Sequence, residues 1–160
     1  MSKITPNLWF DGQAEEAARF YVRLFPDSSL DEVSRAPADN PSTKAGDVLL
    51  VRFTLAGQPF VGINGGPQFP FTEAVSFQID CADQAEVDRY WAALTADGGE
   101  PGQCGWLKDR FGLSWQVVPR QLGDYLAGPD PAGCQRAMEA MLEMRKLDVE
   151  ALRIAYEGEG

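Results

Sequence analysis

Histidine is absent from the sequence, and this absence excludes several common kinds of active site. Without an imidazole group there is no Ser-His-Asp triad, no histidine-paired cysteine nucleophile, no HExxH zinc site and no histidine proton shuttle. Cysteine is scarce as well: Cys81, Cys104 and Cys134 are odd in number and show no C-x-x-C spacing. We therefore expect buried free thiols, with neither a disulfide framework nor a thiolate zinc site.

Positive charge is in short supply, because 14 Lys and Arg residues stand against 24 Asp and Glu residues and leave a formal charge of −10. Nucleic-acid binding depends on Lys and Arg displacing counterions from phosphates, and an anionic membrane surface makes the same demand. No apolar run reaches the roughly 18 residues of a spanning helix. Residues 1–10 also lack the apolar core and cleavage site of a signal peptide. The sequence thus predicts a cytoplasmic protein with no nucleic-acid or membrane partner.

The composition is that of a globular protein, and the chain contains an internal repeat. Its 160 residues, 44% hydrophobic and 24% charged, suit one domain or two small similar halves that share a core. Gln-Ala-Glu begins at Gln13 and returns at Gln84, an offset of 84 − 13 = 71. Each copy follows a short apolar-polar alternation that ends in Asp, at Asp11 and at Asp80. Chance similarity between amphipathic helices is the alternative, but the shared context favours two related halves.

Hydrophobic periodicity predicts the same order of elements in both halves. The first half has expected strands at 4–10, 29–36, 48–55 and 60–64 and a helix at 13–25. The second has expected strands at 74–80, near 105–108 and at 113–119, with a helix at 83–94 and a turn at 109–112. Each half is approximately βαβββ. We expect one domain over 1–160, with module one at about 3–66, module two at about 73–120 and a helical tail at about 121–158.

The tail has its own helix signals. Asp130 is suited to cap a helix whose first residue is Pro131, and a second helix is expected to start at Asp148. The first of these helices carries an apolar stripe of Ala137, Met138, Met141 and Leu142. Such a stripe packs either on the protein's own sheet or on a second subunit, and we prefer the second subunit.

Three segments carry a family resemblance: FDGQAEEAARFY at 10–21, INGGPQF at 63–69 and GQCGWLKDRFGLSWQVVPR at 102–120. With the βαβββ-βαβββ order they resemble the vicinal oxygen chelate superfamily, and within it the PhnB-like group labelled 3-demethylubiquinone-9 3-methyltransferase domain proteins. The superfamily includes glyoxalase I, extradiol dioxygenases and the bleomycin and fosfomycin resistance proteins. The resemblance covers about 4–156 and implies an α+β fold in which two βαβββ modules form a curved mixed sheet around a cleft, often in a homodimer.

The same resemblance allows the metal site to be tested by position. Metal-dependent members carry His or Gln on the first strand of a module and Glu on the last. Those positions fall on Thr5, Ala74 and Gln116 here, and Asn64 is the only polar candidate near the end of module one. Neutral side chains bind divalent cations far less well than carboxylates, so no metal is expected. Gln68 stands where related sequences often have histidine; it can bind a ligand through hydrogen bonds but cannot take up a proton near neutral pH.

The methyltransferase label of this group implies a binding site for S-adenosylmethionine. Most class I S-adenosylmethionine enzymes have a glycine-rich turn between a parallel strand and a helix. Here Gly65-Gly66 is followed by Pro67, Phe69 and another strand, and no helix opens at the turn. No cofactor is therefore expected, and no catalytic residue is assigned.

Strand alternation then selects the residues that should line the cleft. With Leu8 and Phe10 facing the helix, their neighbours face inward. Alternation gives Asn7, Trp9, Ser76 and Gln78 as candidate ligand-binding residues. The resemblance adds Asn64, Gln68 and Gln116, and Trp106 is a further candidate at the mouth of the cleft if the strand phase is as expected. Aromatic walls and neutral hydrogen-bonding groups suit a planar or partly apolar small molecule, although these residues also suit a barrel interior that is simply filled. Trp115 is expected in the core under a helix.

Two further side chains remain ambiguous. Arg52 either binds an anionic group in the cleft or lies at a solvated strand edge, which is the preferred interpretation. Cys104 has no legible base beside it and is not expected to be a nucleophile. The sequence thus favours a homodimeric small-molecule-binding protein without metal chemistry. The alternative is an enzyme of the same superfamily, either of the labelled methyltransferase type or a metal-dependent isomerase or lyase.

Overall fold

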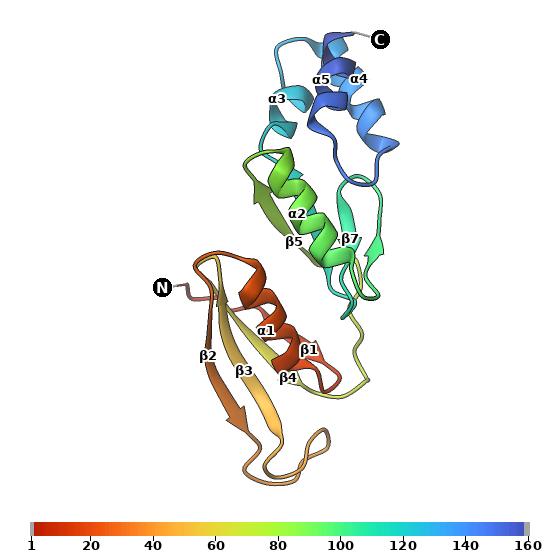
Figure 1. Cartoon of the computed structure of the whole chain (residues 1–160). Coiled ribbons are helices and arrows are strands. Elements are labelled where there is room, and N and C mark those ends of the chain that lie inside the picture. Colours follow the sequence, from red (N-terminus) through yellow and green to blue (C-terminus); the bar gives the residue numbers. More distant parts are fainter. Residues whose placement is uncertain (1, 159–160) are drawn as a thin grey trace. The chain divides into compact units, whose positions relative to one another are not determined.

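The computed structural model describes residues 2–158 and divides them into two compact units between Phe71 and Thr72 (Figure 1). Each unit contains a four-stranded mixed sheet, and helices follow the second sheet. The predicted α+β class with two βαβββ modules and C-terminal helices is confirmed. Residues 1, 159 and 160, which belong to the expected domain of 1–160, lie outside the described residues.

The first unit follows the predicted order of elements. It consists of β1 (Asn7–Phe10), α1 (Ala14–Leu24), β2 (Ser29–Arg35), β3 (Val48–Leu55) and β4 (Gln58–Asn64). The sheet order is β1-β4-β3-β2, and only the β1–β4 pair is parallel. The first strand begins at Asn7 rather than at residue 4, since Pro6 has no N–H group to donate to a ladder.

Helix α1 covers one face of this sheet with small side chains. Ala14, Ala17 and Ala18 are fully buried, and Tyr21 completes the buried stripe. Gly62 of β4 lies beneath them, because a Cβ at this position would come within 3.2 Å of the Ala14 Cβ. The close approach of helix and sheet fixes which face of the sheet forms the core.

The second unit repeats the topology. It contains β5 (Ser76–Cys81), α2 (Gln84–Thr95), β6 (Glu100–Pro101), β7 (Trp106–Lys108) and β8 (Ser114–Pro119). The sheet order is β5-β8-β7-β6, and again the first and last strands of the module pair in parallel. The two units therefore share one arrangement, as the repeat predicts.

Asp109 organises the predicted turn at 109–112. Its carboxylate accepts hydrogen bonds from the backbone N–H groups of Phe111 and Leu113 and from the indole of Trp115, at 2.9, 3.1 and 2.9 Å. Asp109 is only 2% exposed, and these three donors satisfy the buried carboxylate. Trp115 is 4% exposed and packs against Phe77, so its expected place in the core is confirmed.

Three helices end the chain: α3 (Leu122–Leu126), α4 (Pro131–Leu142) and α5 (Val149–Glu157). Both predicted caps are present, because Asp130 accepts from the Ala132 N–H and Asp148 from the Ala151 N–H. Helix α3 lies within the expected helical tail, but the sequence does not locate it as a separate helix, because a segment of five residues that includes Gly123 is too short to show a helical period.

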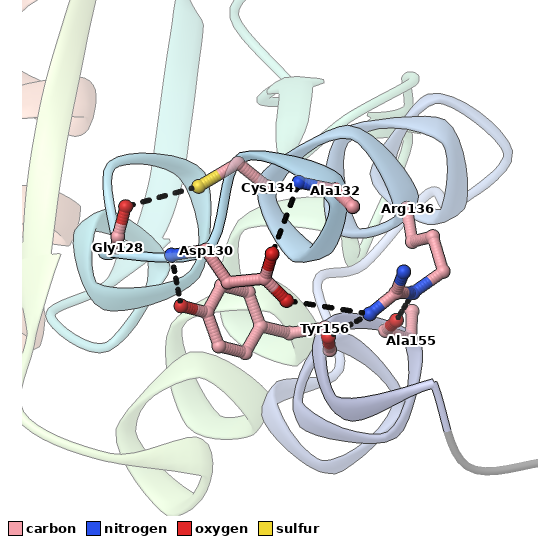
Figure 2. A network of polar contacts seen from close by, with 7 residues as sticks. All are labelled: Gly128, Asp130, Ala132, Cys134, Arg136, Ala155 and Tyr156. Carbon is pink, nitrogen blue, oxygen red and sulfur yellow. Dashed lines mark hydrogen bonds and ion pairs between the residues drawn. The ribbon is translucent and has the colours of Figure 1, made fainter.

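Helices α4 and α5 are joined by the polar network in Figure 2. Arg136 donates to the backbone carbonyls of Ala155 and Tyr156, at 2.9 and 2.6 Å, near the C-terminus of α5. The Tyr156 hydroxyl accepts from the Asp130 N–H at 3.1 Å. A cation at a helix C-terminus also interacts favourably with the helix dipole, so Arg136 stabilises α5 as well as the pair.

Residues 144–149 attach these helices to the second sheet. The Cys104 and Gly105 N–H groups donate to the carbonyls of Met144 and Arg145, both at 2.8 Å. The Gln84 side chain at the start of α2 donates to the Leu147 carbonyl and accepts from the Val149 N–H, at 2.9 and 2.8 Å. Leu147 is only 1% exposed. One glutamine thus holds both sides of a buried leucine.

The apolar stripe of α4 is divided by this packing. Ala137 is buried, but Met138 and Leu142 are 49% and 59% exposed. The stripe therefore does not pack as a whole on the chain's own sheet. None of the helices formed by residues 2–158 is long and apolar enough to cross a membrane.

Replacement of Gln84 by Ala should loosen the attachment of the C-terminal helices. The change leaves the Leu147 carbonyl and the Val149 N–H without partners, at a cost of about 1–3 kcal/mol. We expect hydrogen exchange at the Val149 amide to become about 5- to 150-fold faster, because 1.4 kcal/mol corresponds to a factor of ten.

Gln13 offers a matched control, since it occupies the same place in the repeat and makes no capping bond with its side chain. Gln13→Ala should change stability by less than about 0.5 kcal/mol. Equal exchange rates at Val149 in the wild type and in Gln84→Ala would contradict the attachment.

Candidate functional site

Helix α2 covers one face of the second sheet, and most of the candidate polar side chains of this unit lie on the other. Leu107, Trp115, Val117 and Ile79 are buried on the helix side. Because side chains alternate along a strand, the intervening residues point to the opposite face. We call this surface the helix-free face of unit two, and its residues are Ser76, Gln78, Glu100, Trp106, Lys108, Ser114 and Gln116.

The strand register arranges these residues in two rows. Trp106 of β7, Gln116 of β8 and Gln78 of β5 are direct cross-strand partners and form the aromatic-amide row. Glu100, Lys108, Ser114 and Ser76 are partners in the same way and form the charged row. The Gln116 amide donates to the Ser76 hydroxyl at 2.9 Å and links the rows. The structure therefore brings together the predicted residues Ser76, Gln78, Trp106 and Gln116.

A pocket of about 500 Å³ opens at the β6–β7 end of this face. Its side chains include Glu73, Glu100, Trp106, Lys108 and Ser114. Lys108 forms an ion pair with Glu73, and this contact lowers the pKa of the Glu73 carboxyl and raises the pKa of the Lys108 ammonium. Both groups are solvent-exposed, so the pair contributes little to stability and mainly positions charge at the pocket.

Ser114 is the buried polar group of this pocket. The residue is 1% exposed, and its hydroxyl oxygen has no hydrogen-bond partner among the described residues. A buried hydroxyl without a partner costs free energy, which a hydrogen bond from a bound molecule would restore. Sequence reasoning did not select Ser114, Lys108 or Glu73. Strand alternation could have placed Lys108 and Ser114 on one face of the sheet, but Glu73 precedes β5 and has no such signal.

In the first unit, Trp9 packs against the loop of residues 65–69 that follows β4, which we call the junction loop. Its indole N–H donates to the Gly66 carbonyl at 2.8 Å, and its ring lies 4.8 Å from that of Phe69, centroid to centroid. A Cβ at Gly65 would lie 2.2 Å from the indole, so only glycine fits there. Gln68 is exposed on this loop. Asn7 is exposed as well, and its amide donates to the Thr5 carbonyl at 3.0 Å.

The expected orientation of Asn64 is wrong. Asn64 is the register partner of Phe10, which is buried under α1, and is itself only 6% exposed. Its side-chain oxygen accepts from the Ala14 N–H and its amide donates to the Val48 carbonyl, both at 2.9 Å. The first bond satisfies a free N–H group of the first turn of α1, so Asn64 holds helix and sheet together.

Arg52 is engaged in an ion pair, and the three cysteines are free thiols. Arg52 lies on β3, between β2 and β4, so the expected strand edge is wrong; its guanidinium lies 3.4 Å from the Glu32 carboxylate. Burial, with the nearby Glu86 and Asp80 carboxylates, raises the pKa of the Cys81 thiol to about 12 and keeps it protonated. Only Cys81 is fully buried, since Cys104 and Cys134 are half-buried.

The residues at the superfamily's metal positions do not fit a divalent cation. Thr5 is exposed, Ala74 has only a methyl group, and the Gln116 amide is engaged with Ser76. Within residues 2–158 no group of three His, Cys, Asp or Glu side chains converges. The Gly65-Gly66 segment does not fit S-adenosylmethionine in the usual manner either, because Trp9 occupies the space against it and the chain continues to β5 without a helix.

The same fold recurs in a fosfomycin resistance protein from Listeria monocytogenes that was solved with Mn(II) and sulfate. That structure is 15% identical, covers 79% of this chain and 95% of its own, and has a TM-score of 0.54. Residues 2–118 match the model of the 3-demethylubiquinone-9 3-methyltransferase family. The chain belongs to this family, in the PhnB-like group.

Two further solved structures are similar. A PhnB protein from Bacillus cereus is 35% identical, covers 74% of this chain and 99% of its own, and has a TM-score of 0.66. A protein from Pseudomonas aeruginosa is 21% identical, covers 74% and 98%, and has a TM-score of 0.61. Among curated proteins, none is significantly similar to this chain. The family match ends at residue 118, so helices α3 to α5 lie beyond it.

Replacement of Asn64 by Ala should destabilise the first unit without affecting ligand binding. The Ala14 N–H and the Val48 carbonyl would lose their partners, at a cost of about 1–3 kcal/mol in the free energy of unfolding. Urea denaturation measures this loss. Asn7→Ala, at an exposed asparagine on β1, is the control and should cost less than about 0.5 kcal/mol. Equal losses in the two variants would contradict the assigned role.

Proposed function

We propose that this protein binds a small molecule on the helix-free face of unit two. The observation that carries the proposal is the aromatic-amide row, in which Trp106, Gln116 and Gln78 lie side by side on neighbouring strands. Aromatic area supplies affinity and a few amides set orientation, which is the usual composition of a small-molecule site. The ligand is planar or partly apolar, with groups that accept or donate hydrogen bonds.

The other predicted ligand-binding residues divide into two groups. Ser76, whose hydroxyl accepts from the Gln116 amide, remains a proposed contact on the helix-free face of unit two. Asn7, Trp9 and Gln68 remain proposed contacts in the first unit, where the Trp9 indole also donates to the Gly66 carbonyl. Asn64 is omitted, because both ends of its amide already bind the backbone.

A methyl transfer is the second candidate function, and the observation in its favour is the match of residues 2–118 to a family described by that activity. The two candidates differ in their first requirement. A methyltransferase must bind S-adenosylmethionine, whereas the proposed binding protein needs no cofactor.

The test uses 2-naphthylmethanol as a neutral planar probe, with binding followed by chemical-shift changes in NMR spectra. Trp106→Ala should weaken binding about 3- to 10-fold, since an aromatic pair is worth about 0.5–1.5 kcal/mol beyond its area. Trp106→Phe should recover part of this affinity. Gln116→Ala should weaken binding by about 3-fold through the loss of one hydrogen bond.

The control is Gln135→Ala, an exposed glutamine on α4, which should leave the affinity unchanged. Binding that is insensitive to Trp106 and Gln116 would overturn the proposed site. Stoichiometric binding of S-adenosylmethionine, followed by methyl transfer to a phenol, would favour the second candidate instead.

We also propose that the protein is a homodimer formed through α4. The exposed Met138 and Leu142 support this, because they lie one helical turn apart and form an apolar strip on an otherwise acidic chain. Its three cysteines are free, which suits a reducing compartment and supports a cytoplasmic location.

Sedimentation velocity tests the dimer. We expect a species of about twice the chain mass of 17.5 kDa at micromolar concentration. The double variant Met138→Lys, Leu142→Lys should sediment as a single chain with unchanged helical content, because it charges the proposed contact. A wild-type protein that sediments near 17.5 kDa would refute the dimer.

A further inference from the structure

We propose that the pocket lined by Glu73, Glu100, Trp106, Lys108 and Ser114 selects ligands that carry an ammonium group attached to a planar or apolar body. This inference rests on the proposed binding function and adds the charge of the ligand to it. It concerns Glu100, Lys108 and Ser114 of the charged row, which the proposed function does not use, and in particular the buried Ser114 hydroxyl that has no partner among the described residues.

The charges of the lining residues favour a cation. Two carboxylates, Glu73 and Glu100, face one ammonium, Lys108, so the pocket carries one net negative charge. Lys108 is already paired with Glu73. Glu100 is the cross-strand partner of Lys108, and its carboxylate also acts on the Lys108 ammonium through charge, but within the described part of the chain its side chain makes no hydrogen bond or close ion pair. Glu100 is therefore the group that is left to bind a ligand cation, and the chain's overall charge of −10 attracts cations to it.

Ser114 supplies the second contact. Its buried hydroxyl lines the same pocket and has no partner among the described residues. A hydroxyl oxygen accepts hydrogen bonds from N–H donors, and its proton remains free for an acceptor on the ligand. An amine that carries a neighbouring hydroxyl or carbonyl group would satisfy Glu100 and Ser114 together.

Trp106 supplies the apolar contact beside the charged row. It lies two residues from Lys108 on β7, so both side chains point to the helix-free face, about 6–7 Å apart along the strand. The face of an indole ring attracts cations as well as planar rings. The apolar body of the ligand lies over the aromatic-amide row while its ammonium group reaches the charged row.

The competing interpretation is an anion site at Lys108. Lys108 is the only cation among the lining side chains, but it lies between two carboxylates, and an anion would have to displace Glu73 and approach Glu100. A ligand ammonium has no such obstacle. The sign of the preferred charge therefore decides between the two interpretations.

The experiment compares three probes with one ring system: 2-naphthylmethylamine, 2-naphthylmethanol and 2-naphthoate. Dissociation constants are measured by NMR titration at pH 7 in low salt, with each variant's spectrum as a check on folding. We expect the amine to bind about 10-fold more tightly than the alcohol and the carboxylate to bind most weakly. The preference should shrink in 0.5 M NaCl, where the screening length falls to about 4 Å.

Three variants assign the effect to residues. Glu100→Gln should weaken the binding of 2-naphthylmethylamine about 5-fold and leave the binding of 2-naphthylmethanol unchanged. Lys108→Met should make 2-naphthylmethylamine bind about 2- to 5-fold more tightly, because the substitution frees the Glu73 carboxylate from its ion pair. Ser114→Ala should weaken the binding of 2-naphthylmethylamine and 2-naphthylmethanol, because their polar groups lose a hydrogen-bond partner. The contact of the ring system with Trp106 should be unchanged. Glu143→Gln, at an exposed carboxylate on α4's C-cap, is the matched control and should change nothing.

The outcomes separate this inference from the proposed function. If the three probes bind equally and still depend on Trp106, the proposed binding face stands and the charge selectivity is wrong. If 2-naphthoate binds most tightly and Lys108→Met abolishes its binding, the pocket is an anion site. If no probe binds, or if binding is insensitive to Trp106 and Glu100 alike, both the inference and the proposed function are overturned.

Discussion

The burial of one face of each sheet under a helix is the constraint on which the rest of the molecule depends. In the first unit, the alanines of α1 lie directly against Gly62, and in the second, α2 covers Leu107, Trp115 and Val117. Since side chains alternate along a strand, this burial leaves every second residue for the opposite face. Trp106, Gln116 and Gln78 therefore lie in one row once β5, β7 and β8 have paired in register. The candidate site is a consequence of core packing, and it needs only the strand register to be defined.

Alternation explains which side chains the sequence placed on the correct face of a sheet and which it did not. For Ser76, Gln78, Trp106 and Gln116, the apolar residues between them fixed the phase correctly. Asn64 was assigned by its polarity instead, although Phe60, Gly62 and Asn64 share the helix-facing phase of β4. A buried amide is stable there because the first turn of α1 offers an unpaired N–H group and β3 offers a carbonyl. Backbone partners of this kind leave no signal in the sequence.

The C-terminal helices show a similar division between local and long-range information. Asp130, Pro131 and Asp148 are local signals, and they predicted where α4 and α5 begin. Their attachment was not predictable, because it is made by the backbone carbonyls of Met144 and Arg145 and by the side chain of Gln84. Gln13 and Gln84 occupy the same place in the repeat. Of the two side chains, only that of Gln84 binds a second segment within the described residues, at Leu147 and Val149. The family match ends at residue 118, so this second use of a repeated glutamine accompanies helices that the family model does not include.

The two rows of the helix-free face have different physical consequences for binding. A neutral amide or indole can be covered by a ligand at small cost if its hydrogen bonds are replaced, so under the proposed function we expect the aromatic-amide row to contribute affinity with little dependence on salt. The charged row lies at the solvent edge, where Glu73 and Lys108 interact through water-screened charges that are weak in stability terms. Weak mutual pairing leaves these groups free to respond to a ligand's charge. Affinity and charge selectivity are thus assigned to adjacent residues on the same strands, and substitutions in one row should alter one property without the other.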